Sequence, residues 1–297
     1  RSTPKPSSAA SDVYKRQQMN ILMILSDNTF PPDIRVKKEA EILIKHGYKV
    51  YLLAIRGKNQ KKHEVVNGVS VFRFNVPFLL YLYFYRYLII LHILRLTKRR
   101  NIDAYHVHDL PCALASCLAG KLTNRPVIFD IHENYIAMKR SALRLQSPLK
   151  RILTILFLSI LDLEERICLK YASRILVVAE EHIKRLTALG VKRAKIFVVS
   201  NTPNINELKE LVRRTEKRES QDRFIISYIG GFSYHRGLDT LIKALPLVAR
   251  KNRNFHVFLV GDGDVKPVLE KMVEELNIKE YVEFTGWVDF GEAMHYV

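Results

Sequence analysis

The sequence predicts an α/β protein made of two doubly wound domains, each with a parallel sheet between layers of helices. Short apolar runs of strand length alternate with helical stretches over most of the first 200 residues, and repeated strand–helix–strand units are typical of such sheets. The polar, charge-rich segment 201–222 interrupts the alternation, and a new strand–helix cycle begins at residue 225.

These boundaries divide the chain into four parts. Residues 1–18 lack apolar periodicity, and their last part resembles the translation of a transposon end used in sequencing libraries. We interpret them as a read-through artefact before a true start at Met19; a disordered native tail is the alternative. Residues 19–202 form the first domain, 203–222 a linker and 223–297 the start of a second domain. Its three strands fall short of the roughly four to six that sheets usually contain, so we expect this domain to be incomplete.

The elements of the first domain follow from apolar patterning. Residues 21–25 are a continuous apolar run, as expected for a strand buried on both faces. Residues 33–46 have helical periodicity and end before Gly47, a natural helix stop. Further strands are predicted at 49–54, 69–74, 103–107, 127–130, 174–178 and 196–199. The second domain repeats the pattern with strands at 225–229, 255–260 and 282–285 and helices at 237–251 and 265–276.

The composition is strongly basic, with 48 Lys and Arg against 30 Asp and Glu, a net charge of +18. This balance favours an anionic partner such as a nucleotide, an anionic lipid surface or a nucleic acid. Because we find no basic recognition helix or RNP-like strand, we expect no nucleic-acid partner. The three cysteines, Cys112, Cys117 and Cys168, lie in apolar stretches without a Cys-x-x-Cys pair. We therefore expect buried, reduced thiols.

Residues 76–96 form an unusually apolar stretch that ends at a basic run, 98–100. Its length approaches the roughly 20 apolar residues that span a bilayer, but Arg86 lies at its middle. Three interpretations remain open: docking in a membrane interface, a partly buried core helix, or a spanning helix.

Candidate functional residues follow the strands, because ligands of open α/β sheets bind at the carboxyl ends of strands. No glycine triplet follows the first strand, which counts against a dinucleotide-binding turn. Asp33 there suits the cap of the next helix, and Arg35 could meet an anion in the cleft. His108 ends one strand, and His132 and Glu133 follow the next strand. A histidine beside a carboxylate at two adjacent strand ends indicates a functional site. We expect no metal, since neither a His-x-x-x-His helix nor a cysteine set is present.

Two glycine turns mark the second domain. Gly230 and Gly231 follow its first strand, and Arg236 precedes the helix that starts near Gly237. Glycines allow close backbone approach, a helix N-terminus attracts anions, and an arginine fork suits a phosphate. Gly261 and Gly263 form a second such turn at the same sheet edge.

Together these strings resemble the family-4 retaining glycosyltransferases of the GT-B fold, in which two Rossmann-like domains face a cleft. The resemblance covers essentially residues 19–297. It rests on FPPDIR, VHDLP, FDIHE and VVSNTPN in the first half, and on YIGGFSYHRGLDTLIKAL, FLVGDGD and VEFTGWV in the second.

The resemblance implies sugar transfer, with retention, from a UDP- or GDP-linked donor to a lipid-linked or saccharide acceptor, without a metal or other cofactor. His108 matches the family histidine that contacts the donor sugar, and the turn from Gly230 to Gly237 matches the diphosphate cradle. Catalysis is thus assigned to His108 and Arg236, and donor binding to Gly230, Gly231, Arg236, Gly261 and Gly263. Asp33, Arg35, His132 and Glu133 would lie on the acceptor side.

The sequence departs from the family in two respects. Gly231 and Arg236 stand where the family often has Arg and Lys, so one cation of the cradle is missing and another is exchanged. The family's Glu-x7-Glu motif, expected beyond this point, is not supplied after Gly291. We therefore expect a truncated chain that does not turn over.

The basic charge and the 76–96 stretch favour a cytoplasmic protein bound peripherally to the inner face of the membrane, acting in bacterial envelope polysaccharide or glycolipid synthesis. The alternatives are another GT-B enzyme, such as a sugar-nucleotide epimerase, and a non-catalytic binding protein of the same fold.

Overall fold

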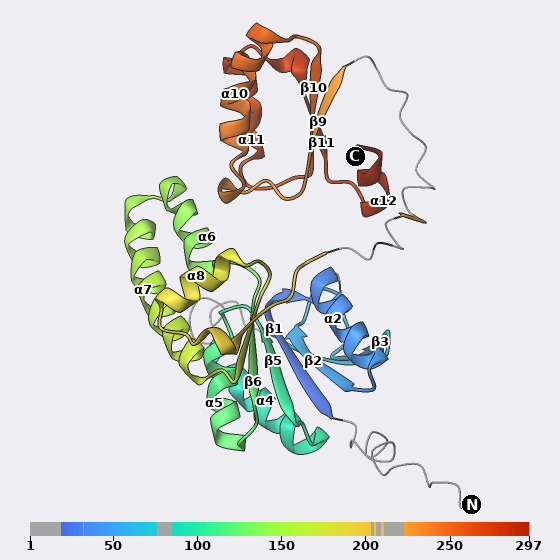
Figure 1. Cartoon of the computed structure of the whole chain (residues 1–297), viewed down its shortest axis with the longest axis vertical. Coiled ribbons are helices and arrows are strands. Elements are labelled where there is room, and N and C mark those ends of the chain that lie inside the picture. Colours follow the sequence, from blue (N-terminus) through green and yellow to red (C-terminus); the bar gives the residue numbers. More distant parts are fainter. Residues whose placement is uncertain are drawn as a thin grey trace, which may run out of the picture. The chain divides into compact units, whose positions relative to one another are not determined.

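A computed structural model of the chain describes residues 19–31, 33–75, 85–202, 205, 209–210 and 223–296 (Figure 1). The tail 1–18 and most of the expected linker lie outside these residues. By its internal contacts the chain divides into two compact units. Unit 1 contains Arg1–Arg140 and Ser147–Asn201, and unit 2 contains Ser141–Gln146 and Thr202–Val297.

Unit 1 is built on an eight-stranded sheet with the order β3-β4-β2-β1-β5-β6-β7-β8. The strands are β1 (Asn20–Thr29), β2 (Lys49–Ile55), β3 (His63–Val66), β4 (Val69–Phe74), β5 (Ala104–His108), β6 (Val127–Ile131), β7 (Arg174–Val177) and β8 (Ile196–Val198). All neighbours pair in parallel except β3 and β4. The doubly wound α/β prediction is thereby confirmed.

The antiparallel strand β3 departs from the all-parallel sheet that we predicted. Asn67 and Gly68 join it to β4, and both have positive φ, 51° and 82°. This is the backbone of a tight hairpin turn, for which Asn-Gly is the strongest short-range sequence signal. The dipeptide was the available clue to this edge hairpin.

Helices cover both faces of the sheet (Figure 1). They are α2 (Ile34–Lys45), α4 (Tyr85–Arg100), α5 (Ala113–Thr123), α6 (Tyr135–Ser141), α7 (Pro148–Tyr171) and α8 (Glu181–Ala188), with the 3-10 turn η2 (Arg193–Lys195). The 3-10 turn η1 (Ala142–Leu145), between α6 and α7, is assigned to unit 2. Val36 and Ala40 of α2 pack against Met23 and other residues of β1, β2 and β4. Because successive strand residues face opposite sides, the equally buried Leu22 faces the layer formed by α4, α5 and α7, which contact one another in that order.

Unit 2 contains a three-stranded parallel sheet with the order β11-β10-β9. Its strands are β9 (Phe224–Ile229), β10 (Phe255–Val260) and β11 (Val282–Gly286). Its helices are α10 (Leu238–Lys251), α11 (Lys266–Glu275) and α12 (Phe290–Ala293), with 3-10 turns η3 (Tyr234–Arg236), η4 (Lys279–Tyr281) and η5 (Met294–Tyr296). Ile242 and Leu269 bring α10 and α11 into one core with Val257 and Leu259 of β10. The strands and helices predicted here are confirmed to within about two residues.

The apolar stretch 76–96 is described only in part, because residues 76–84 lie outside the described residues. In the described part, Ile89, Ile93 and Leu96 of α4 are buried, so this part is a half-buried helix packed on the domain. No helix in the described ranges is long and apolar enough to cross a membrane. The three cysteines are free and buried, as expected.

Candidate functional site

The loop between β1 and α2 is fixed by Arg73 of β4, which is buried. Its Nε and Nη2 donate to the carbonyl of Phe30 at 3.1 and 2.6 Å, and its Nη1 donates to the carbonyl of Lys61 at 2.8 Å. Phe30 is itself buried. The first turn of α2 is thus held in a defined position at the carboxyl end of the sheet.

Asp33 caps α2, as the sequence predicts. Its Oδ1 accepts hydrogen bonds from the backbone N–H groups of Arg35 and Val36 at 3.1 and 3.2 Å. The guanidinium of Arg35 lies 3.7 Å from the same carboxylate. The positive charge of Arg35 is also among the causes that lower the pKa of His108. The structure therefore places Arg35 in the electrostatic neighbourhood of the strand ends.

Two histidines from β5 meet an aspartate from the neighbouring strand β6. His108 pairs in register with Asp130, and the rings of His106 and His108 lie 4.4 Å apart, on the same side of β5, as strand alternation requires. His106 Nε2 is 3.1 Å from Asp130 Oδ2, within hydrogen-bond distance, and His108 Nδ1 is 3.6 Å from the same oxygen. The imidazole of His108 is completely buried.

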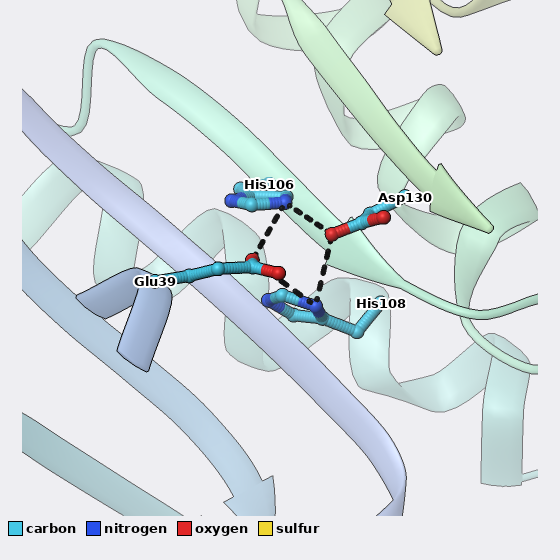
Figure 2. A group of neighbouring side chains, drawn as sticks. All are labelled: Glu39, His106, His108 and Asp130. Atoms are coloured by element: carbon cyan, nitrogen blue, oxygen red, sulfur yellow. Dashed lines mark hydrogen bonds and ion pairs between the residues drawn. The ribbon is translucent and has the colours of Figure 1, made fainter. Parts of the chain in front are cut away.

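Glu39 of α2 completes this cluster from the other side (Figure 2). Its Oε2 lies 3.6 Å from His106 Nε2 and 3.9 Å from His108 Nδ1. Glu39 was not among the predicted site residues, although it lies one turn after the buried Val36 and so close to the inward face of the helix. A carboxylate next to a buried stripe is the signal that could have identified it.

His132 joins the cluster through a second carboxylate. Its backbone N–H donates to Asp109 Oδ1 at 3.1 Å, and its Nδ1 lies 3.2 Å from Asp109 Oδ2. Its Nε2 is 3.1 Å from Asp130 Oδ2 but lacks the alignment of a hydrogen bond. Asp109 occupies the left-handed region at φ 59°, a conformation that aspartate tolerates better than most residues. The predicted Glu133 follows His132 directly and is half-buried.

Burial and neighbouring charges give these groups different protonation states. Burial is the largest of the causes that together lower the pKa of His108 well below its usual value, so its ring is neutral. Burial also acts to lower the pKa of His132, but its interactions with the Asp109, Asp130 and Glu39 carboxylates outweigh this and raise the pKa to about 12. Burial acts to raise the pKa of Asp130, yet its close contacts with His106 and His132 hold the pKa well below its usual value. An ionised pair thus lies beside a neutral imidazole.

The ring nitrogens of His108 have no hydrogen-bond partner among the residues that the structure describes. Buried polar atoms are rarely left unpaired, and those that are often have a catalytic role or an absent ligand. A neutral imidazole offers one donor and one acceptor. His108 can therefore pair with a hydroxyl or another small polar group of a bound molecule.

The same cluster has the residue types of a metal site. Ligand atoms of Glu39, His106, His108 and Asp130 all lie within 4.8 Å of one another, and imidazoles and carboxylates are ligands of zinc and related ions. However, Asp130 already interacts with His106 and His132 as an ionised acceptor. Asp130 Oδ2 thus has a hydrogen-bond partner in His106, whereas Glu39 Oε2 and the ring nitrogens of His108 have none among the described residues.

The two glycine turns of unit 2 are packed against each other. Gly230 N–H donates to the Val260 carbonyl at 2.9 Å, and Phe232 N–H donates to the Asp262 carbonyl at 2.8 Å. A Cβ at Gly261 would lie 2.0 Å from the Gly230 carbonyl oxygen, and one at Gly263 would lie 2.3 Å from that of Phe232. The absence of side chains at Gly261 and Gly263 is thus required by the neighbouring turn itself.

Gly231 and Gly237 differ from this pair, because a Cβ at either would meet no atom within 4 Å in the described parts of the chain. Gly237 has φ 70° and is the N-cap of α10, and Arg236 directly before it is exposed. The turn therefore presents open backbone, a helix N-terminus and a guanidinium together, a combination that suits an anion. Unit 1 and unit 2 each bring their own predicted residues together at strand ends.

Comparisons with known proteins give consistent matches. Residues 35–206 match the family described as Glycosyltransferase Family 4, and residues 209–297 match Glycosyl transferases group 1. An alpha-D-kanosaminyltransferase of Streptomyces kanamyceticus is 24% identical over 67% of this chain and 53% of its own length. An uncharacterized glycosyltransferase of Methanocaldococcus jannaschii, MJ1607, is 24% identical over 86% of this chain and 65% of its own length.

A shorter match is the lipopolysaccharide core biosynthesis glycosyltransferase LpsD of Rhizobium meliloti, 32% identical over 35% of this chain and 28% of its own length. The chain thus spans less than two thirds of the length of each of these curated relatives.

Two solved structures share the fold. Sucrose-phosphate synthase of Thermosynechococcus elongatus superposes with a TM-score of 0.65 at 16% identity, covering 94% of this chain and 73% of its own. HepE of Anabaena, in complex with UDP-glucose, superposes with a TM-score of 0.59 at 15% identity, covering 93% and 71%. At such low identities, the likeness concerns the fold.

Proposed function

The chain belongs to Glycosyltransferase Family 4, and we propose that the protein transfers a sugar from a nucleotide-diphosphate donor to an acceptor hydroxyl with retention at the anomeric carbon. The observation that carries the proposal is the buried, neutral His108, whose ring nitrogens lack hydrogen-bond partners in the described structure, at the carboxyl end of β5. A group of this kind can contact a sugar hydroxyl without introducing charge.

The donor would bind through its diphosphate at the turn from Gly230 to Gly237. Support comes from the open backbone at Gly231, the N-terminus of α10 and the adjacent Arg236. The nucleotide would be UDP or GDP, and the UDP-glucose complex of the structurally similar HepE favours UDP. Gly261 and Gly263 contribute by keeping the second turn close behind the first.

The reaction would proceed by attack of the acceptor hydroxyl on the same face of the sugar that the diphosphate leaves. The departing phosphate takes the proton of the attacking hydroxyl. Arg236 and backbone N–H groups stabilise the charge that develops on the leaving diphosphate, and His108 positions the donor sugar. No protein nucleophile, metal ion or other cofactor is required by this scheme.

Asp33, Arg35, His132 and Glu133 would line the acceptor side, with the acceptor a lipid-linked sugar or a saccharide. The basic composition favours an acceptor at an anionic membrane surface, and we assign the protein to the cytoplasmic face of a bacterial membrane. The partial match to LpsD supports a role in envelope polysaccharide or glycolipid synthesis.

Replacement of Arg236 by Ala tests the donor site. In the longest form of the protein that its gene encodes, Arg236→Ala should lower the rate of sugar transfer by about 100-fold, the usual loss of one charge-stabilising group. The matched control is Arg253→Ala, an exposed arginine in the loop before β10. An unchanged transfer rate in Arg236→Ala would show that the cradle is wrongly assigned.

Product analysis with labelled donor separates the alternatives. An epimerase would convert the donor sugar without an acceptor, whereas a non-catalytic protein of this fold would bind nucleotide and leave the donor intact.

A further inference from the structure

Helix α7 carries an apolar stripe that faces away from the domain. Its buried face includes Leu158, Leu161 and Leu169, which pack against the rest of unit 1. On the opposite face, large apolar side chains recur at helical spacing and are 49–71% exposed: Leu149, Ile152, Leu153, Leu156, Ile160 and Leu163. We call these six residues the α7 stripe. Monomeric proteins seldom expose contiguous apolar surface of this kind without a partner.

Most of the stripe lies in a part of the chain whose charged residues are all basic. From residue 135 to residue 161 the sequence contains no Asp or Glu, whereas it contains Lys139, Arg140, Arg144, Lys150 and Arg151. Lys139 and Arg140 at the end of α6 and Lys150 and Arg151 in the first turn of α7 are all exposed. α6 ends at Ser141 and α7 begins at Pro148, so only a short connection separates the two pairs of cations in the sequence. Cations therefore concentrate in and just before the first turn of α7, where the stripe begins.

The combination of an apolar stripe and clustered cations indicates which kind of partner covers this surface. A second copy of this chain would bring the same cations against their own kind, which like-charge repulsion opposes. A bilayer with anionic lipids offers both complements, because the acyl boundary receives the apolar face and the headgroups attract Lys and Arg. Clusters of four to eight basic residues on an amphipathic helix are typical of such binding.

We propose that the α7 stripe and its adjacent cations dock unit 1 onto an anionic lipid surface. The α7 stripe contains no residue of the apolar stretch 76–96. Docking by α7 would hold the protein at the membrane, where a lipid-linked acceptor lies. This role in bringing the protein to its acceptor rests on the proposed function. The docking itself needs neither donor nor turnover.

Vesicle co-sedimentation tests the inference with the chain as it is. The chain should bind vesicles of phosphatidylcholine mixed with phosphatidylglycerol, and bind much more weakly to phosphatidylcholine alone. Ile152→Ser with Leu156→Ser should lower the partition coefficient at least about tenfold, since apolar insertion is lost. Lys150→Gln with Arg151→Gln should lower it about 25-fold on anionic vesicles, from about fivefold for each cation near such a surface.

Matched pairs elsewhere on the surface provide the controls. Leu118→Ser with Leu122→Ser removes two exposed leucines at the same spacing on α5, and Arg250→Gln with Lys251→Gln removes adjacent cations at the end of α10. Both should leave vesicle binding within about twofold, a change much smaller than one anchoring cation provides.

Three outcomes would overturn the proposal: no binding of the unaltered chain to anionic vesicles, equal losses in the α7 variants and their controls, or a dimer that the α7 substitutions dissociate while no vesicle binding occurs. Because vesicle binding is measured without substrate, its failure leaves the transferase assay to decide the proposed function separately.

Discussion

Alanine at Gly261 should strongly destabilise unit 2, whereas alanine at Gly231 should not. A Cβ at Gly261 would lie 2.0 Å from the backbone oxygen of Gly230, and Gly261 has φ +140°. Overpacking against backbone costs about 1–3 kcal/mol, and a non-glycine residue in such a conformation costs about 1–3 kcal/mol more. We therefore expect a loss of about 2–6 kcal/mol in the free energy of unfolding.

Gly231 is the matched control, since a Cβ there meets nothing within 4 Å in the described structure. Its change to alanine should alter the free energy of unfolding by less than about 1 kcal/mol. Hydrogen exchange of the backbone amides of β9, β10 and β11, followed by mass spectrometry during urea denaturation, reports on unit 2. Equal unfolding midpoints for Gly261→Ala and Gly231→Ala would refute the account of how the two glycine turns pack.

Three further predictions concern the cluster in unit 1 and the chemistry proposed for it. His108→Ala should lower sugar transfer about 100- to 1,000-fold, as loss of one positioned polar group does, and its failure to do so in a donor-saturated assay would remove His108 from the site. Asp130→Asn should lower the free energy of unfolding of unit 1 by about 3–5 kcal/mol in urea denaturation, because it leaves the protonated His132 without one of its buried carboxylates. The control Asp239→Asn breaks a pair with the largely exposed Lys243 and should cost less than about 1 kcal/mol. Comparable losses of stability in the two variants would contradict the buried network. Sugar transfer should persist in the presence of EDTA. The contrary result is inactivation by the chelator together with stoichiometric zinc in the purified protein, and it would indicate a functional metal held by Glu39, His106, His108 and Asp130.

The fold could be predicted largely because its strands are buried on both faces and appear as continuous apolar runs. The strand 21–25 and its neighbours were recognisable for this reason. The edge strand β3 was missed because its burial is only partial, which leaves no apolar run, and because the signal lies in the Asn67–Gly68 turn. Boundaries differ by one or two residues where strands continue past the apolar run, and by more at β1, which continues to Thr29.

The site was predictable where sequence neighbours share a strand end. His106 and His108 fall on one side of β5 by alternation, and Asp130 lies opposite His108 because β5 and β6 pair in register. Glu39 could not be identified in the same way, since it enters from the middle of α2 and its relation to the strand ends depends on how that helix lies across the sheet. The mutual packing of Gly230 with Gly261 likewise depends on the register of β9 and β10.

The central claim is that this protein transfers a sugar with retention, and the configuration of the product tests it most directly. The longest form of the protein encoded by its gene should be incubated with α-linked UDP- and GDP-sugars and a lipid extract that contains acceptors. The product should then be followed by the coupling constant of its anomeric proton in NMR. The account predicts a new α-glycosidic linkage that forms together with free nucleoside diphosphate. A β-linked product, or an epimerised donor with no linkage formed, would contradict it.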